Sequence, residues 1–419
     1  MKAVKTLRMV AATLLVTDFA FAQTWTQTSA PTNLWAAIAS SADGAKLVAV
    51  AGNGYPNNGG SMSPIYVSID SGVTWLQTSA PSNHWASVAS SADGTKLVAA
   101  VGGDNFNPSH AGPIYTSTNG GTTWISNSVP ALYWRSVASS ADGSKLFAVT
   151  FSSGQLYIST NSGSDWTSNA APEGAWTIAS SADGIKLVAA PSVYTGGRIC
   201  TSTNSGVTWV TNPSPSSTWW SVASSADGIK LAAVDGYGGP AHIYTSTDAG
   251  TTWISNRVPL LTWHYVALSA DGTKLVAAAW QGSGLPTGPI YTSTNSGLTW
   301  ISNSVPYLTW QGVASSADGN QFVAIAQGAG SEITNPGLGN GRVWISNTTP
   351  SSQLNLTSSS NNLVLSWTIP STNFVLQQSS NLVSWADITN TPVLNLTNLK
   401  NELALSPSNS SSFYRLKTP

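Results

Sequence analysis

The chain has 419 residues, a formal net charge of −1 and only 8% charged residues, against roughly 25% in an average globular protein. Such a low charge leaves no basic surface for DNA, RNA or anionic lipid, so nucleic acid is not an expected partner. The single cysteine, Cys200, excludes an internal disulfide and is expected to be a buried strand residue.

The first 22 residues have the pattern of a secretory signal peptide. A basic start is followed by an apolar run over residues 9–16, and Ala20-Phe21-Ala22 forms a small-residue cleavage site before Gln23. The run is too short to span a bilayer, and no later apolar stretch is longer. We therefore expect a mature protein without a membrane span, located in the periplasm or secreted.

Pairs of tryptophans with nine residues between them recur along residues 23–350. The pairs are Trp25/Trp35, Trp75/Trp85, Trp124/Trp134, Trp166/Trp176, Trp209/Trp219, Trp253/Trp263 and Trp300/Trp310. Ala-Asp-Gly turns accompany them about 40 to 50 residues apart, which is the length of one propeller blade. The repeat predicts an all-β fold, a seven-bladed β-propeller with four strands in each blade.

The four strands of one blade can be assigned from the pattern. A first strand such as Trp134–Ser140 turns at Ala-Asp-Gly into a second such as Lys96–Ala100, because Asp-Gly between β-rich runs indicates a hairpin. A third strand such as Gly112–Ser117 precedes a fourth that starts at Thr-Trp-Ile-Ser-Asn. We interpret the seven tryptophans that begin the first strands as packing residues rather than as a ring of sugar-stacking indoles.

The turn between the third and fourth strands carries a family resemblance. Residues 68–75, Ser-Ile-Asp-Ser-Gly-Val-Thr-Trp, resemble the Asp-box, or bacterial neuraminidase repeat, and six copies occur at blade spacing. The resemblance implies a structural role for the Asp or Asn side chain, which accepts hydrogen bonds from turn amides. These residues are Asp70, Asn119, Asn161, Asn204, Asp248 and Asn295.

The seventh copy is missing. Residues 341–346 match a third strand, yet no such turn follows them, whereas Thr24-Trp25-Thr26-Gln27 matches a fourth strand with no blade in front of it. We therefore expect the N-terminal strand to complete blade 7, which removes an exposed sheet edge.

Residues 351–419 lack the repeat. Strand-like runs at 363–367, 374–378 and 413–416, separated by Ser- and Asn-rich turns, predict a small β-sandwich. This segment resembles the short C-terminal modules of secreted bacterial proteins that attach or retain a larger domain. A cap over one propeller face is an equal alternative.

Residues that depart from the repeat concentrate in the connections between second and third strands and between consecutive blades. These connections open on one propeller face, which we call the loop face, while the Ala-Asp-Gly and Asp-box turns occupy the opposite turn face. One group around blades 5 and 6 combines charged groups with indoles that suit a stacked sugar. It comprises Trp220, Asp235, His242, Arg257, His264 and Trp280.

A second group on the loop face is a candidate metal site. His84, Asp104 and His110 offer two imidazoles and a carboxylate, although a hydrogen-bonded loop explains them as well, because no compact ligand motif is present. No cofactor is expected.

Three functional classes fit the resemblance. Sialidases share Asp-boxes, but their Arg-Ile-Pro motif and Tyr–Glu pair are not found here, and they have six blades. Xyloglucan-cleaving hydrolases use two facing seven-bladed propellers, and one is present. Other Asp-box propellers are protein-assembly or sorting scaffolds. We expect a non-catalytic, monomeric binding propeller that recognises a glycan or a cell-surface protein, with a glycoside hydrolase or a protein scaffold as the alternatives.

Overall fold

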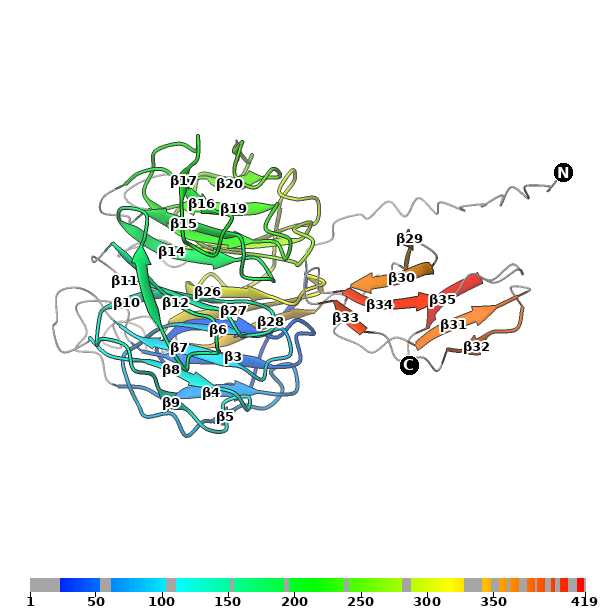
Figure 1. The fold of residues 1–419 in the computed structure, drawn as a ribbon, viewed down its shortest axis with the longest axis horizontal. Helices are drawn as coiled ribbons and strands as arrows, with labels where there is room; N and C mark the ends of the chain where they lie inside the picture. The colour runs from blue at the N-terminus through cyan, green and yellow to red at the C-terminus, as the bar shows by residue number, and fades with distance from the viewer. Residues whose placement is uncertain are drawn as a thin grey trace.

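The computed structural model describes residues 23–52, 62–102, 111–150, 154–191, 196–236, 241–280, 288–327 and 341–347, and, towards the C-terminus, 354–359, 362–368, 375–380, 383–388, 393–395, 400–405 and 413–417. All regular elements in these residues are β-strands (Figure 1). The described part of the chain contains no helix long and apolar enough to cross a membrane.

Seven four-stranded antiparallel sheets form the blades of a β-propeller. Blade 1 has β2 (Trp35–Ser40), β3 (Leu47–Ala51), β4 (Ile65–Ser68) and β5 (Leu76–Gln77). Blade 2 has β6 (Trp85–Ser90), β7 (Leu97–Val101), β8 (Ile114–Ser117) and β9 (Ile125–Ser126). Blade 3 has β10 (Trp134–Ser139), β11 (Leu146–Thr150), β12 (Gln155–Ser159) and β13 (Thr167–Ala170). Blade 4 has β14 (Ala175–Ser180), β15 (Leu187–Pro191), β16 (Cys200–Ser202) and β17 (Val210–Thr211).

The remaining three blades follow the same order. Blade 5 has β18 (Trp219–Ser224), β19 (Leu231–Asp235), β20 (Ile243–Ser246) and β21 (Ile254–Ser255). Blade 6 has β22 (Trp263–Leu268), β23 (Leu275–Ala279), β24 (Ile290–Ser293) and β25 (Ile301–Ser302). Blade 7 has β26 (Thr309–Ser315), β27 (Gln321–Gln327), β28 (Val343–Asn347) and, from the other end of the chain, β1 (Trp25–Gln27).

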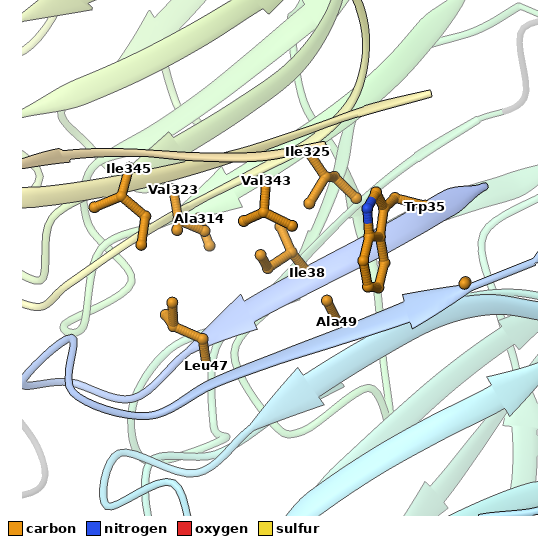
Figure 2. Close-up of a cluster of buried hydrophobic side chains, with 10 residues drawn as sticks. Trp35, Ile38, Leu47, Ala49, Ala314, Val323, Ile325, Val343 and Ile345 are labelled. Carbon is orange, nitrogen blue, oxygen red and sulfur yellow. The ribbon is translucent and has the colours of Figure 1, made fainter. Parts of the chain in front are cut away.

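The N-terminal strand closes the ring, as the sequence predicts. β1 pairs antiparallel with β28, with Trp25 opposite Ser346, and the Trp25 side chain is buried in the core between blades 6 and 7. The first strands of successive blades contact one another in order, and β26 contacts β2. The core between blades 7 and 1 packs Trp35 and Ile38 against Val343 and Ile345 (Figure 2).

The strand register separates the two faces of the propeller. In blade 1, Ser40 pairs with Leu47 and Leu47 with Ser68, so the first and third strands end at the turn face. Trp35 pairs with Ala51 at the opposite end, which is the loop face. The second strands are buried along their whole length because they lie between neighbouring sheets on both sides.

A closed ring of backbone hydrogen bonds joins all seven blades at the turn face. Each Ala of an Ala-Asp-Gly turn donates its N–H to the same carbonyl in the next blade, from Ala42 to Ala92 and finally from Ala317 back to Ala42, at 2.7 to 2.8 Å. The ring surrounds a cavity of about 160 Å³ lined by Ser and Ala residues of every blade. These bonds fix the spacing of the blades at the axis.

The six turns between third and fourth strands share the hydrogen bonds of the Asp or Asn and of the Ser side chain, and four of them add a bond from the Trp side chain. In blade 1, Asp70 Oδ1 accepts from the Thr74 N–H at 2.8 Å, Ser68 Oγ accepts from the Gly72 N–H at 2.8 Å, and Trp75 Nε1 donates to the Gly72 carbonyl at 3.1 Å. The Thr74 hydroxyl donates to Asp70 Oδ2 at 2.6 Å, and these bonds lower the pKa of Asp70, those from Thr74 most. In this turn the Asp70 carboxylate therefore accepts hydrogen bonds from both the backbone and the side chain of Thr74.

Blade 4 departs from the sequence interpretation. Ala175, and not Trp176, occupies the position of the other first-strand tryptophans, since Ala175 pairs with Pro191 as Trp35 pairs with Ala51. The assignment of Trp176 as a repeat packing residue is therefore wrong. The other six tryptophans are at most 1% exposed, as expected of packing residues. In the cluster between blades 3 and 4, Phe147 packs beside the smaller Ala175.

The C-terminal residues form a second all-β unit of two sheets. One sheet has the order β29 (Asn355–Ser359), β30 (Asn362–Thr368), β34 (Lys400–Leu405) and β33 (Val393–Asn395). The other has β32 (Ala386–Asp387), β31 (Val375–Ser379) and β35 (Phe413–Lys417). Leu365 and Trp367 of the first sheet share a core with Leu376 of the second, which gives the predicted small sandwich.

Candidate functional site

Each first strand contains a β-bulge directly after its first buried residue, at the loop face. The bulge adds one unpaired residue, which lies opposite no partner in the second strand. From blade 1 to blade 7 these residues are Ala36, Ala86, Arg135, Trp176, Trp220, His264 and Gln311. The repeat is thus uniform in backbone geometry at this position and varies in chemistry.

The bulge residues of blades 3 to 6 contact one another in sequence. The Arg135 guanidinium lies over the Trp176 ring, 4.4 Å from its centroid. The Trp176 and Trp220 centroids are 6.2 Å apart with the planes at 58°, and Trp220 stacks on His264 at 3.8 Å and 16°. Trp280, which directly follows β23, joins them, and we call these five residues the aromatic arc.

His264 is the innermost member of the arc. Its imidazole lies between Trp220 and Trp280, whose centroid is 4.9 Å away at 13°, and the residue is 2% exposed. Burial lowers its pKa to about 3, a hydrogen bond with the Gly236 backbone opposes this, and the positive charge of Arg135 lowers it further. The imidazole is therefore neutral at physiological pH and serves as a flat, uncharged spacer between two indoles.

The backbone of blade 5 approaches this stack closely. A Cβ atom placed on Gly236 would lie 2.1 Å from the Trp263 carbonyl oxygen and 3.0 Å from His264 Cδ2, so only glycine fits. The Tyr265 ring lies 6.1 Å from the His264 ring at 72°, its hydroxyl donates to Gln311 Oε1 at 3.4 Å, and burial raises the Tyr265 pKa. These contacts hold the inner layer of the arc in one arrangement.

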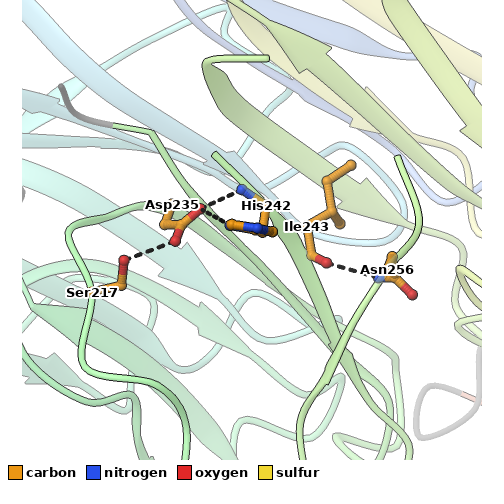
Figure 3. Close-up of polar contacts among 5 residues, drawn as sticks. All are labelled: Ser217, Asp235, His242, Ile243 and Asn256. Carbon is orange, nitrogen blue, oxygen red and sulfur yellow. Dashed lines mark hydrogen bonds and ion pairs between the residues drawn. The ribbon is translucent and has the colours of Figure 1, made fainter. Parts of the chain in front are cut away.

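Asp235 and His242 form a separate polar contact at the loop-face end of blade 5 (Figure 3). Asp235 Oδ2 accepts from Ser217 Oγ at 2.8 Å, and Oδ1 accepts from the His242 N–H. The same Oδ1 lies 3.9 Å from His242 Nδ1, whose side chain is 40% exposed. Both Asp235 oxygens thus hold the ends of neighbouring chain segments together.

The structure therefore places the predicted residues in three environments. Trp220, His264 and Trp280 form one stack, and Asp235 and His242 form the adjoining polar contact. Arg257 is exposed in the connection from β21 to β22.

Sequence reasoning missed Trp176 as a member of the arc because its spacing from Trp166 matches the repeat. The sequence does contain a feature that marks the difference, because a Val or Ile follows three residues after each of the six packing tryptophans, but two residues after Trp176. Counting back from Ile178 identifies Ala175 as the packing position.

The metal prediction falls mostly outside the described residues. Asp104 and His110 lie in the range 103–110, and only His84 is described, with its carbonyl accepting the Gly102 N–H at 2.9 Å. Among described residues, no three His, Cys, Asp or Glu side chains come together as metal ligands. The site stays a prediction. Cys200 is buried, and burial raises the pKa of its thiol, in keeping with the expected strand residue.

Comparison with known proteins supports the fold. No family model and no curated protein matches this chain. YCF48 from Cyanidioschyzon merolae is 16% identical with a TM-score of 0.52, covering 77% of this chain and 98% of that chain. A structure of YCF48 bound to D1 peptide is 15% identical with a TM-score of 0.53, covering 79% and 98%. The GH74 xyloglucanase from Xanthomonas campestris is 14% identical with a TM-score of 0.56, covering 82% of this chain and 59% of that one. At these identities the likeness establishes a β-propeller fold.

Proposed function

We propose that this protein is a non-catalytic binding propeller whose ligand site is the aromatic arc on the loop face. The observation that carries the proposal is the change in side-chain type at the bulge position from one blade to the next. Blades 1 and 2 place Ala36 and Ala86 there, whereas blades 3 to 6 place one guanidinium and three aromatic rings in continuous contact. Propeller packing needs only the residue before the bulge, and three members of the arc, Arg135, Trp220 and Trp280, keep partly exposed side chains that a ligand can contact.

The chemistry of the arc favours binding over hydrolysis. Glycoside hydrolysis requires two carboxyl groups with roughly 5 to 10 Å between them, one acting as an acid. The arc holds no carboxylate, and Asp235 already uses both oxygens for structural hydrogen bonds. His264, with a pKa of about 3, is a neutral imidazole at neutral pH and not the imidazolium that a general acid requires.

The ligand we favour is a glycan. Indole faces stack on the apolar face of a sugar ring, and a guanidinium donates hydrogen bonds to hydroxyl or carboxylate groups. Trp220 and Trp280 are half-buried, so part of each indole remains accessible, and Arg135 is half-buried beside Trp176. Arginine and tryptophan are also the common anchors of protein interfaces. A peptide of a surface protein is therefore the second candidate, and the similar propeller bound to D1 peptide supports it.

The proposal includes the organisation expected from the sequence. The six hydrogen-bonded turns support assignment to the Asp-box class of repeats. Residues 1–22 act as a signal peptide, 23–350 form the propeller, and 351–419 form a module that attaches the protein or caps a face. The mature protein is then a monomer in the periplasm or outside the cell.

A glycan array of the mature protein tests the proposal. Trp220→Ala and Arg135→Ala should each weaken binding by about 1 to 3 kcal/mol, up to roughly a hundredfold. Trp124→Ala is the matched control, because Trp124 is a half-buried indole of a turn-face repeat with its Nε1 bonded to Gly121. Equal binding by both arc variants and wild type would refute the arc as the site. Cleavage of an array glycan would favour the hydrolase, and binding only to peptides would favour the protein scaffold.

A further inference from the structure

The first described residue, Gln23, is buried and is held through its backbone and its side chain. It is 7% exposed and precedes β1. Its backbone N–H donates to Asn303 Oδ1 at 2.8 Å, and its side-chain Oε1 accepts from Ser346 Oγ. Asn303 is 4% exposed and Ser346 is fully buried, so the site is enclosed by blade 6 on one side and β28 on the other.

The expected cleavage site lies directly before this residue. Removal of residues 1–22 would leave an α-amino group on Gln23, and such groups have pKa values of about 7.7 to 8.0, so they are cationic at neutral pH. The nitrogen has one acceptor here, a neutral amide oxygen that also accepts from Thr292 Oγ1 at 3.4 Å. A buried ammonium with three N–H donors and a neutral partner is strongly disfavoured.

We propose that Gln23 is the mature N-terminus and that it is converted to pyroglutamate before β1 docks. The α-amino nitrogen attacks Cδ of its own side chain, a bond forms between this nitrogen and Cδ, and the Cδ–Nε2 bond breaks. The Nε2 group leaves as ammonia, taking up one proton from the attacking amine, with no oxidation or reduction. The reaction closes an unstrained five-membered lactam.

The product matches the groups that surround it. A pyroglutamyl residue is neutral and has one ring N–H and one ring carbonyl, whereas Asn303 Oδ1 offers one acceptor and Ser346 Oγ one donor. Cyclisation removes the charge and the surplus donors that burial penalises. Docking of β1 then encloses the modified residue, since Trp25, two residues later, is buried in the core between blades 6 and 7.

Mass spectrometry of the N-terminal peptide from the exported protein tests the modification. The expected peptide begins at residue 23, lacks the mass of one ammonia, and resists Edman degradation until pyroglutamyl peptidase is added to the unfolded protein. A peptide with a free α-amine on Gln23, or a chain that begins at another residue, would overturn the proposal. The inference rests on the expected cleavage and not on the loop-face ligand, so either can fail without the other.

A variant of Gln23 separates the effect of a charged α-amine from the effect of a changed side-chain shape. Gln23→Asn keeps an amide but cannot form the five-membered ring, so its α-amine stays free, and Gln27→Asn, at an exposed position of the same strand, is the matched control. Burial lowers the pKa of a free amine in the folded state, so Gln23→Asn should melt below wild type at about pH 6 and approach it at about pH 9. The difference in melting temperature between wild type and Gln27→Asn should not change with pH. A pH-independent loss in Gln23→Asn would contradict the proposal.

Discussion

The His264 imidazole lies parallel to the Trp220 indole, with ring centroids 3.8 Å apart and planes 16° from one another. The two side chains come from the same bulge position of adjacent blades, so the propeller symmetry itself brings them together. Trp280 covers the other face of the imidazole. His264 therefore supports the indoles from within, and the accessible parts of the arc belong to Trp220, Trp280 and Arg135.

Burial of His264 makes stability depend on pH. The unfolded chain protonates this imidazole near its ordinary pKa of 6.5, whereas the folded chain takes up the proton only near pH 3. The unfolded state thus binds more protons between these values, and stability is lost as pH falls from about 6.5 towards 3, by on the order of 4 kcal/mol.

This contribution is measured by comparing wild type with His264→Phe, which keeps a ring between the indoles but cannot be protonated. The free energy of unfolding, from urea titrations, should fall less in the variant than in wild type between about pH 7 and pH 4. Both proteins carry the same carboxylates, so other acid effects cancel. Parallel pH profiles would show that His264 is not buried as a neutral group.

The same substitution in the turns of blades 2 and 3 should have different effects on stability. Asn161 Nδ2 donates to Asp165 Oδ2 at 2.8 Å, whereas in blade 2 Asn119 Nδ2 donates to the Thr123 hydroxyl at 2.9 Å. Asn161→Asp should remove this bond, place two carboxylates together and destabilise the protein by about 1 kcal/mol or more. Asn119→Asp should be nearly neutral, because a Thr hydroxyl can donate instead, as in blade 1.

Thermal unfolding of the two single variants measures this difference, and a double variant provides the control. Asn161→Asp combined with Asp165→Thr recreates the Asp70–Thr74 pair of blade 1 and should restore the melting temperature. Equal stability of Asn161→Asp and Asn119→Asp would contradict the assigned hydrogen-bond directions.

The architecture was predicted well from the sequence because the same pattern of strands and turns recurs along the propeller. Asp-Gly turns, buried second strands and the displaced fourth strand at Trp25 each follow from local patterns, and the pairing of β1 with β28 confirms the closure. Other features of the backbone do not follow from such local patterns. Five turns place a residue other than glycine at positive φ before the expected glycine, such as Ser71 at 57°, which no propensity rule indicates.

The candidate site was only partly predictable. Loop-face residues in blades 5 and 6 were identified as departures from the repeat, but their mutual stacking depends on the bulge, whose extra residue is invisible in a list of strand positions. Arg257 satisfies the same sequence criterion and yet is exposed in a connection between blades. Departure from the repeat thus predicts on which face of the propeller a residue lies. Which of these residues touch one another depends on the backbone geometry, and the sequence pattern does not give that.

Deletion of residues 23–31 tests the closure of the ring. It removes β1 and the buried Trp25 side chain, and it exposes the edge of β28, so we expect aggregation and a lower melting temperature. Size-exclusion chromatography and thermal unfolding of the exported protein measure both effects. Trp25→Phe, which keeps the strand and most of the packing, should remain monomeric. A monomeric deletion variant with an unchanged melting temperature would show that β1 contributes nothing to closure.

The junction between blades 7 and 1 lacks an interaction that other junctions have. At three other junctions the lysine after the Ala-Asp-Gly turn donates its Nζ to the Asp carbonyl of the next blade, from Lys46 to Asp93 at 2.8 Å, Lys145 to Asp183 at 2.9 Å and Lys186 to Asp227 at 2.7 Å. Blade 7 has Gln321 at this position, 1% exposed, and neither its Oε1 nor its Nε2 has a hydrogen-bond partner. A buried amide without partners costs about 1 to 3 kcal/mol.

Gln321→Lys should therefore stabilise the propeller by about 1 kcal/mol or more, because the lysine removes the buried amide and its Nζ can reach the Asp43 carbonyl, as the repeat geometry provides in other blades. Lys145→Gln is the reciprocal control, since it transfers the defect to the junction between blades 3 and 4 and should destabilise by a similar amount. Thermal and urea unfolding of both variants measure the two effects. A loss of stability in Gln321→Lys would show that the side chain at this junction cannot reach Asp43, so that blade 7 meets blade 1 with a spacing different from that of the other blades.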